Sequence, residues 1–302
     1  MLKKLECMEK KEFVIHLDDV EWREVEDGLR IKELLCERLA GKTEFYLGVA
    51  ELEAGKSLSL RKANLACCTY ILEGEIWARL GRQRIQLNDE ASNYFPIGAP
   101  YAYEASGKRG LRFLFCYATD NAVGEHLKFQ PVSEEEGRAF YQPNCPSNLM
   151  SPGMPGHGCR WAVAGDMDPY ILVEAAQGQR SLSFQAYFDE IKGCKEMWWG
   201  RTYLKPNCRY TPHYHEQPEI FYFLSGTGTM YAGSNIYKVT PGSLVYAPKN
   251  CLHGMVNDGP DPLCAIYCCN IETAGTSYDR YEVSDVPLVV PADRSDLMLS
   301  EQ

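Results

Sequence analysis

Three side chains that could bind a metal ion stand close together in the segment TPHYHEQPEIFYFLSG, residues 211–226. His213 and His215 are separated by one residue, and Glu219 follows four residues after the second histidine. Residues two apart on a β-strand point to the same face, so both imidazoles face one way, and Glu219 shares their parity if no bulge intervenes. Burying these groups without partners would cost several kcal/mol. We therefore expect a divalent cation, because imidazole and carboxylate are natural ligands of Zn, Fe, Mn, Ni or Cu.

A fourth ligand is expected from the segment GSLVYAPKNCLHGMVN, residues 242–257. Proline and asparagine near His253 predict a turn that could present its imidazole to the other three side chains. Three imidazoles and one carboxylate leave positions open on an octahedral ion, whereas structural zinc sites are usually closed and rich in thiolates. The set therefore favours an active or binding site for one divalent transition metal ion. The alternative is a group of ordinary polar side chains on a solvated strand face.

The elements that must position these residues are predicted to be short strands. Runs rich in Val, Ile, Tyr, Phe and Trp are broken by Gly, Asn, Asp and Pro, as in YILEGEIWARLGRQRIQL (70–87) and FYFLSGTGTMYAGSNIYKV (221–239). This spacing predicts an all-β barrel or sandwich with few helices. Two short helices are expected, KELLCERL (32–39) and SEEEGRAFY (133–141), and Ser133 is the expected N-cap of the second.

The chain contains an internal repeat at an offset of 152 residues, without a gap between residues 48 and 117 of the first copy. Glycine, proline and aromatic positions stay in register, including Gly48 with Gly200, Tyr70 with Tyr222, Gly74 with Gly226, Pro96 with Pro248 and Cys116 with Cys268. We expect two copies of one domain. Residues 1–141 would form the N-terminal barrel, 142–158 a connector, and 159–302 the C-terminal barrel with a peripheral tail.

Composition limits the classes of partner and the compartment. The formal net charge of −10 argues against nucleic acid and against anionic membrane surfaces. The N-terminus has lysines but no apolar core of a signal peptide, and no run is apolar enough to span a bilayer. The 13 cysteines form no CxxC pair and are expected to be reduced thiols in the cytoplasm, with Cys67–Cys68 and Cys268–Cys269 as small core residues.

The two histidine segments resemble the two motifs of the cupin superfamily. The first fits HxH-x3-E-x6-G from His213 to Gly226. The second fits G-x5-P-x-G-x2-H-x3-N from Gly242 to Asn257, except that Asn250 replaces a glycine. The resemblance covers residues 198–270, and the repeat extends it to 48–117. It implies a bicupin, with two small antiparallel β-barrels of the double-stranded β-helix or jelly-roll type and a few short helices.

The same resemblance implies that the metal ligands are His213, His215, Glu219 and His253. Asn250 would take the left-handed backbone conformation that glycine otherwise supplies. The first copy has Arg61, Ala63, Cys67 and Tyr101 at the four ligand positions. We therefore expect the N-terminal barrel to be metal-free, with a structural role or a role in an interface.

Residues 243–278 also resemble the end of the cupin-type phosphoglucose isomerases, with VY-x-P, H-x2-VN-x-G and IY followed by AG-x2-Y at Ala274, Gly275 and Tyr278. This resemblance implies redox-neutral, isomerase-type chemistry on a small hydroxylated carbonyl or sugar-like metabolite. Glu219 would be a ligand and a proton carrier, with Tyr210 or Tyr278 orienting the substrate. Five tyrosines lie on expected strands and one or two could give a hydroxyl to the cavity: Tyr203, Tyr210, Tyr231, Tyr246 and Tyr267.

Two other functions stay open. With iron, the same ligands suit a dioxygenase, and without catalysis the chain would be a metal-dependent module that binds a small ligand. Arg201, Lys205 and Arg209 could bind a carboxylate or phosphate at the mouth of the barrel. The expected partner is a small molecule, and self-association into a homo-oligomer is left open.

Overall fold

The structure is a computed structural model that describes residues 12–106, 108–118, 127–141, 161–163, 170–172, 182–189, 192–270 and 281–282. Strands make up most of its described part and helices very little, which confirms the predicted all-β class with a few short helices. The short helices are η2 (Leu17–Asp19), α1 (Glu37–Ala40) and α3 (Glu134–Ala139). None of the described helices is long and apolar enough to cross a membrane.

The first copy of the repeat forms two sheets, which we call the N-terminal unit. The large sheet has the order β13 (Trp161–Val163), β9 (Ala91–Phe95), β6 (Ala66–Gly74), β11 (Leu111–Ala118), β4 (Phe45–Leu52), β3 (Leu29–Leu35) and β2 (Arg23–Glu26). The small sheet has the order β12 (Phe129–Pro131), β5 (Ser57–Ala63), β10 (Tyr101–Ala105), β7 (Ile76–Leu80) and β8 (Gln83–Leu87).

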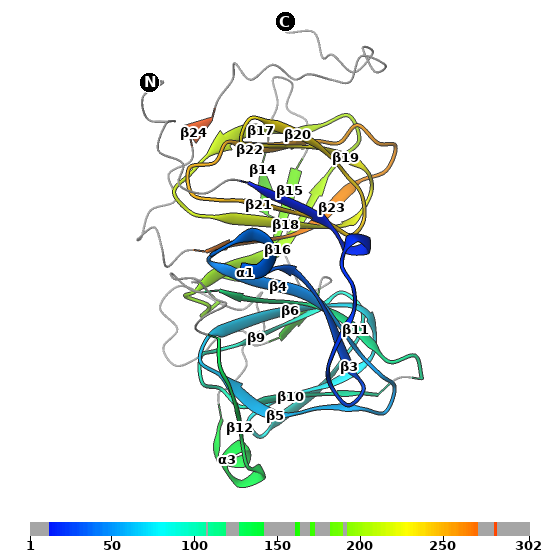
Figure 1. Ribbon diagram of the computed structural model, residues 1–302, viewed down its shortest axis with the longest axis vertical. Helices are drawn as coiled ribbons and strands as arrows, with labels where there is room; N and C mark the ends of the chain where they lie inside the picture. The colour runs from blue at the N-terminus through cyan, green and yellow to red at the C-terminus, as the bar shows by residue number, and fades with distance from the viewer. Residues whose placement is uncertain are drawn as a thin grey trace, which may run out of the picture.

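The second copy forms the C-terminal unit with the same arrangement, stacked on the first along the long axis (Figure 1). Its large sheet has the order β1 (Phe13–His16), β21 (Ser243–Ala247), β18 (Glu219–Ser225), β23 (Leu263–Asn270), β16 (Met197–Leu204), β15 (Leu182–Phe188) and β14 (Tyr170–Leu172). Its small sheet has the order β20 (Asn235–Val239), β19 (Gly228–Ala232), β22 (His253–Val256), β17 (Arg209–Tyr214) and β24 (Tyr281–Glu282).

Each unit receives an edge strand from the segment that precedes the other unit. The first strand, β1, pairs antiparallel with β21 of the C-terminal unit, with Phe13 opposite Tyr246. In return β13 pairs with β9 of the N-terminal unit, with Trp161 opposite Asn93. The expected boundaries assign β1 to the first barrel and β13 to the second, so the sheets depart from them at these two strands. The expected connector, 142–158, lies outside the described residues, and its role stays a prediction.

The two large sheets pack face to face and share one core. Alternate residues of β6 and β18 point into different cores, because successive side chains of a strand point to opposite faces of the sheet. Tyr70 and Tyr222 point into the core between the units. Ile71 and Phe221 point into the interiors of their own units. Strand β23 is therefore buried along its whole length.

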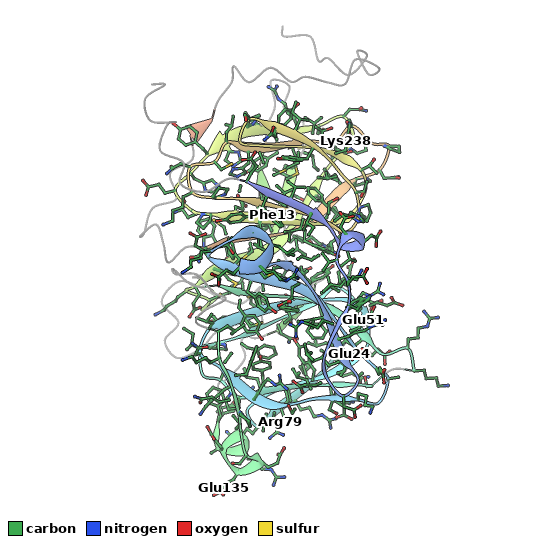
Figure 2. All side chains as sticks on the ribbon, viewed as in Figure 1. Phe13, Glu24, Glu51, Arg79, Glu135 and Lys238 are labelled. Carbon is green, nitrogen blue, oxygen red and sulfur yellow. The ribbon has the colours of Figure 1, made fainter. Side chains whose placement is uncertain are left out.

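Side chains fill both units and the layer between them, as Figure 2 shows. Phe13 lies on the strand that joins the C-terminal unit, whereas Arg79 and Glu135 lie at the opposite end of the molecule. The adjacent cysteines divide between these cores, with Cys67 inside the N-terminal unit and Cys68 between the units. The ten described cysteines are free thiols, and all but Cys208 are buried, as predicted for small core residues.

The predicted helix 32–39 is wrong for residues 32–36, whereas residues 37–39 belong to α1. Residues 32–35 of the predicted helix belong to β3, where Leu34 and Leu35 are fully buried and the strand pairs with β4. Sheet pairing and burial therefore override local helix propensity here. The other helix, α3, is confirmed, because Ser133 accepts a hydrogen bond from the Glu136 backbone N–H as its N-cap.

The repeated glycines have the same structural role in both units. An added Cβ at Gly48 would lie 2.7 Å from the ring of Phe115, and one at Gly200 would lie 2.6 Å from the ring of Tyr267. Each glycine therefore lets one aromatic ring fill the interior of its unit.

Replacing Ile220 by alanine tests the shared core. Ile220 is 1% exposed between the two large sheets, so the change should reduce the free energy of unfolding by about 2–5 kcal/mol. Because both units pack on this core, calorimetry should show one transition that moves to lower temperature as a whole. Ile236→Ala is the matched control, since Ile236 is 42% exposed and should change stability by no more than about 0.5 kcal/mol. Two separate transitions, one unmoved, would contradict a shared core.

Candidate metal centre

Two facing sheets of the C-terminal unit supply the four predicted ligands. His213 lies on β17, His215 follows the last residue of that strand, and His253 opens the neighbouring β22. Glu219 opens β18 in the large sheet. The expectation that His213, His215 and Glu219 share one strand is therefore wrong. The chain turns at residues 215–218 and carries the carboxylate into the opposite sheet.

Backbone contacts hold this turn in place. The Asn250 N–H donates to the carbonyl oxygen of His215 at 2.8 Å, and the Asn270 N–H donates to that of Pro218 at 3.1 Å. Asn250 has φ of 59°, the left-handed conformation expected where the motif pattern has glycine.

The four side chains converge in the interior of the unit. His213, His215, Glu219 and His253 are 0%, 1%, 4% and 1% exposed. One potential ligand atom from each lies within 4.8 Å of the others. The imidazole centroids of His213 and His253 are 4.4 Å apart, and those of His215 and His253 are 4.8 Å apart. The structure thus brings together all four residues of the predicted set.

Two histidines are oriented by backbone carbonyl groups. The Nδ1 of His213 lies 2.8 Å from the oxygen of Thr211, and the Nδ1 of His253 lies 2.9 Å from that of Cys251. A carbonyl oxygen only accepts, so each Nδ1 carries the proton and donates it. In the neutral imidazoles the lone pair then lies on Nε2. Metal-binding histidines are commonly held by this kind of bond on their other nitrogen.

The spacing of the donor atoms fits a single transition metal ion. Glu219 Oε2 lies 3.1 Å from Nε2 of His215 and 3.0 Å from Nε2 of His253. Two ligands about 2.1 Å from an ion, at right angles to each other, are themselves about 3 Å apart. A shared cation also explains why a carboxylate oxygen faces an imidazole nitrogen whose lone pair points toward it. The donors of these residues therefore form a site for one divalent transition metal ion.

The carboxylate stays ionised in this environment. Burial alone would raise the pKa of Glu219, but the contacts of its carboxylate with His215 and His253 outweigh burial and hold the pKa well below its usual range. The ionised form is the one that binds a cation.

Aromatic side chains surround the cluster. The ring of Tyr210 lies 4.5 Å from that of His213, and Phe221 lies 6.1 Å from His253. Tyr267 points into the same interior, where burial first and the nearby Glu219 charge second raise its pKa well above the usual value. Its phenol is therefore neutral. Tyr267 is one of the five tyrosines that the sequence analysis proposed for the cavity, and it aligns with Phe115, an interior residue of the N-terminal unit. Tyr278 lies outside the described residues.

The other tyrosines on the expected strands point elsewhere or lie apart from the cluster. Tyr246 belongs to the core between the units and donates to Glu44 Oε2 at 2.7 Å. Tyr231 lies on β19 between Met230 and Ala232, and those two neighbours, unlike Tyr231, belong to the interior cluster.

The N-terminal unit has a different chemistry at the equivalent place. Arg61 and Tyr101 pair across β5 and β10, as His213 and His253 pair across β17 and β22. Within the described residues, the group of potential metal ligands is the one in the C-terminal unit. The equivalence therefore supports the view that the two units descend from one repeat with different interiors.

Comparisons with known proteins agree with this architecture. Residues 200–269 match the family described as Cupin domain. The chain has no match among curated proteins.

Solved structures extend the likeness to the whole fold. The oxalate decarboxylase of Lactobacillus farciminis, in a formate complex, is 14% identical with a TM-score of 0.65, over 91% of this chain and 89% of that chain. A single-residue variant of the Bacillus subtilis oxalate decarboxylase is 17% identical with a TM-score of 0.66, over 98% of this chain and 88% of that chain. The same enzyme at pH 4.6 is 18% identical with a TM-score of 0.65, over 98% and 86%. At this level of identity the likeness establishes a shared two-domain fold.

His253→Ala should remove the bound metal and leave the fold in place. It deletes one donor of the four, and even the loss of a group that only orients a ligand weakens metal binding by roughly 10–100-fold. Metal content measured by mass spectrometry should fall from one equivalent to a small fraction, while circular dichroism stays that of the parent. Tyr101→Ala is the matched control at the equivalent position of the N-terminal unit, and its metal content should be unchanged. Retention of one full equivalent by His253→Ala would contradict the assignment.

Proposed function

We propose that this chain, a two-domain member of the cupin superfamily, is a metal-dependent enzyme acting on a small hydroxylated carbonyl compound by redox-neutral, isomerase-type chemistry. The observation that carries the proposal is the buried convergence of three imidazoles and one carboxylate. Four protein ligands on an octahedral ion leave two positions for substrate oxygens. A bound divalent ion would supply Lewis-acid polarisation of the substrate carbonyl.

The residues of the chain have separate roles in this proposal. His213, His215, His253 and Glu219 hold the ion, and the carbonyl groups of Thr211 and Cys251 fix the tautomers of two of the histidines. The low pKa of Glu219 suits a permanent ligand. It does not suit the proton carrier that the sequence analysis proposed, because a carboxylate of low pKa is a weak base.

Hydrogen-bond donation and substrate orientation are therefore assigned to phenols. Tyr210 is 3% exposed beside His213, and Tyr267 lies in the same interior with a neutral hydroxyl. Either hydroxyl can donate to the carbonyl oxygen of the substrate and stabilise the negative charge that develops there. The apolar rings around them exclude water, which strengthens such a hydrogen bond. Tyr278 remains a proposed partner in this role.

The distribution of cations favours a neutral substrate over a dicarboxylate. Arg201 is the one buried arginine or lysine within residues 192–270, and its Nη1 contacts Glu90 Oε1 at 2.8 Å and the Tyr70 hydroxyl at 3.2 Å. Those partners belong to the N-terminal unit. In the same range Lys192 bonds to the carbonyl oxygen of Ala186, and the remaining lysines and arginines are exposed. A doubly charged substrate would therefore meet no buried side-chain cation from this range.

The structural neighbours favour a second candidate reaction. They are named as oxalate decarboxylases, and decarboxylation is also redox-neutral and suits a Lewis-acidic ion. This support rests on fold similarity, which does not carry the substrate across. The two candidate reactions differ in the charge of the substrate, because oxalate carries two negative charges and the substrates of the proposed isomerase-type reaction carry none.

Free thiols support the expected reducing compartment. The ten described cysteines form no disulfide among themselves, which agrees with a cytoplasmic location. The net charge of −10 supports a small-molecule partner over nucleic acid.

The reaction class can be tested by proton exchange. The metal-loaded protein, held under nitrogen in D₂O, should incorporate deuterium at the carbon next to the carbonyl of small hydroxyaldehydes and hydroxyketones, as followed by proton NMR. A chelated sample and the His253→Ala variant should show only the background rate. Oxalate is assayed in parallel for formate and CO₂, and we expect none. Turnover that requires stoichiometric O₂ would replace the proposal with a dioxygenase, and metal-dependent binding without exchange would replace it with a binding module.

Tyr210→Phe tests the proposed phenol. Loss of a positioned proton donor should lower kcat by roughly 100-fold or more, with metal content and melting temperature unchanged. Tyr231→Phe is the matched control, because Tyr231 is a buried tyrosine outside the interior cluster of the same unit. A Tyr210→Phe enzyme with the parent kcat would remove Tyr210 from the mechanism.

A further inference from the structure

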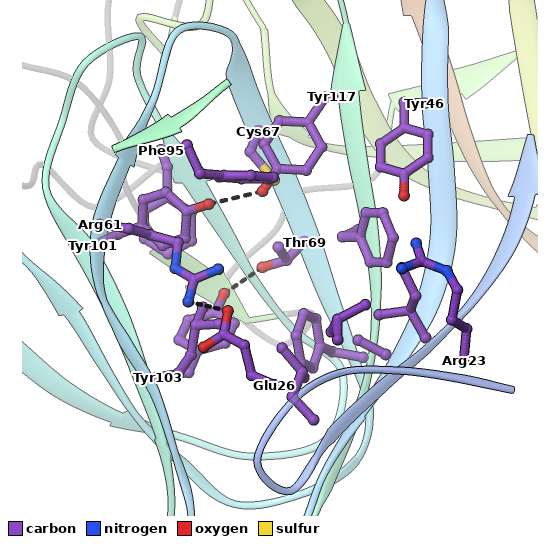
Figure 3. A pocket seen from close by; sticks show the side chains of 18 residues that line it. Arg23, Glu26, Tyr46, Arg61, Cys67, Thr69, Phe95, Tyr101, Tyr103 and Tyr117 are labelled. Atoms are coloured by element: carbon purple, nitrogen blue, oxygen red, sulfur yellow. Dashed lines mark hydrogen bonds and ion pairs between the residues drawn. The ribbon is translucent and has the colours of Figure 1, made fainter. Parts of the chain in front are cut away.

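The N-terminal unit contains a cavity where the C-terminal unit has its metal cluster. The cavity has a volume of about 330 Å³. Arg61, Cys67 and Tyr101, the counterparts of His213, Glu219 and His253, all line it (Figure 3). Where the C-terminal unit has its metal ligands, the N-terminal unit therefore has a partly open space that side chains do not fill.

Aromatic rings form much of the wall. Phe95 stacks on Tyr101 with centroids 4.4 Å apart, and it lies 5.6 Å from Tyr103. Phe113 meets Tyr103 edge to face at 5.2 Å. Each of these rings is 6% exposed or less, so the wall is preformed and rigid. Such a surface is complementary to a planar ring that can stack or make edge contacts.

The hydroxyl groups on this wall are already hydrogen-bonded to one another. The hydroxyls of Tyr101 and Tyr117 are 2.7 Å apart, and Tyr103 donates to Asn93 Oδ1 at 2.7 Å while contacting Thr69 Oγ1 at 2.5 Å (Figure 3). Burial first, and then neighbouring groups, raise the pKa of Tyr117 well above its usual value, so the pair stays uncharged. This part of the wall therefore offers neutral hydroxyls and apolar rings.

Two charged pairs lie at the edge of the cavity, and one of them joins Arg23, which lines it, to Glu33 at 3.2 Å. Arg61 forms an ion pair with Glu26, and its guanidinium lies over the ring of Phe129 at 5.6 Å. The Arg61 side chain is 14% exposed.

Among the described residues, Arg61 donates hydrogen bonds from Nε to Ser59 and from Nη2 to Ser59 and Glu26. The Nη1 group is then available to donate to an oxygen of a ligand. Glu26 and Glu33 already neutralise Arg61 and Arg23, so a ligand carboxylate would meet no unpaired cation and would lie near two other carboxylates, whereas a neutral carbonyl oxygen can accept from Arg61 without that repulsion.

We propose that this cavity binds a small neutral aromatic compound through a carbonyl oxygen directed at Arg61. The volume is at the lower end of the range for ligand pockets, about 300–1,000 Å³. An apolar cavity of about 150 Å³ is enough for benzene, so one or two rings fit here. The site is separate from the metal centre and does not depend on the reaction proposed for it.

Three matched probes test the chemistry of this site. The metal-loaded full chain is titrated with acetophenone, benzoate and cyclohexyl methyl ketone, and binding is followed by saturation-transfer NMR and calorimetry. Acetophenone should bind at least about tenfold more tightly than benzoate, which brings a charge next to Glu26, and more tightly than the saturated ketone, which cannot stack. No binding of acetophenone to the folded protein, or equal binding of all three probes, overturns the proposal.

Variants locate the binding. Arg61→Met should weaken acetophenone about tenfold, whereas Arg84→Met should not change it. Arg84 is the matched control, because it pairs with Glu104 and lies over Trp77 on the same unit without lining the cavity. Ala50→Phe, which fills the cavity from β4, should abolish binding while metal content stays at the parent level. If Ala50→Phe does not fold, the two arginine variants test the proposal. Equal affinities of Arg61→Met and Arg84→Met for acetophenone would overturn it. Loss of acetophenone binding in His253→Ala would also overturn it, because the site would then depend on the metal centre.

Discussion

Burial of the two large sheets against each other is the constraint on which the rest of the structure depends. Strands such as β6, β18 and β23 are covered on both faces, so one set of alternate residues must fit the core between the units and the other set must fit an interior. The sheets have no free face on which to shift register without exposing apolar side chains. This fixed register holds Glu219 at the start of β18 opposite the histidines of the small sheet.

The two units use the same frame for different interiors. In the C-terminal unit, a carboxylate and three imidazoles meet at one point, and burial is tolerable because a cation satisfies all four. In the N-terminal unit, the corresponding positions carry Arg61, Ala63, Cys67 and Tyr101, and tyrosine hydroxyls satisfy one another. Fold and site are thus separable, since the glycines and core residues repeat while the chemistry does not.

The sequence predicted those features that repeat or have a short period. The 152-residue offset indicated two copies, and the strand alternation indicated their class. The sequence also identified the four clustered side chains, because three of them lie within seven residues and the fourth follows a recognisable turn. The turn after His215 was not predicted. An even spacing between two residues places their side chains on one face of a continuous strand, but the same spacing is also compatible with a loop between two strands. Residues 32–35 were predicted as helix because helix propensity is a local property, whereas their pairing with β4 depends on a distant segment.

Features that depend on distant partners could not be predicted. Nothing in FVIH at residues 13–16 specifies that it pairs with β21, because strand signals describe a segment and not its neighbour. The cavity beside Arg61 was also hidden. It depends on the summed volumes of many side chains, and the first copy was expected to be only structural or an interface.

The reciprocal edge strands have a consequence for synthesis on the ribosome. Segment β1 is made before the N-terminal unit, yet its partner β21 is made only after that unit. During that interval β1 has no native partner, and the large sheet of the first half waits for β13 before its own edge is covered. Contacts of such long sequence separation slow folding, so the nascent chain must remain soluble with an open edge until its second half is made.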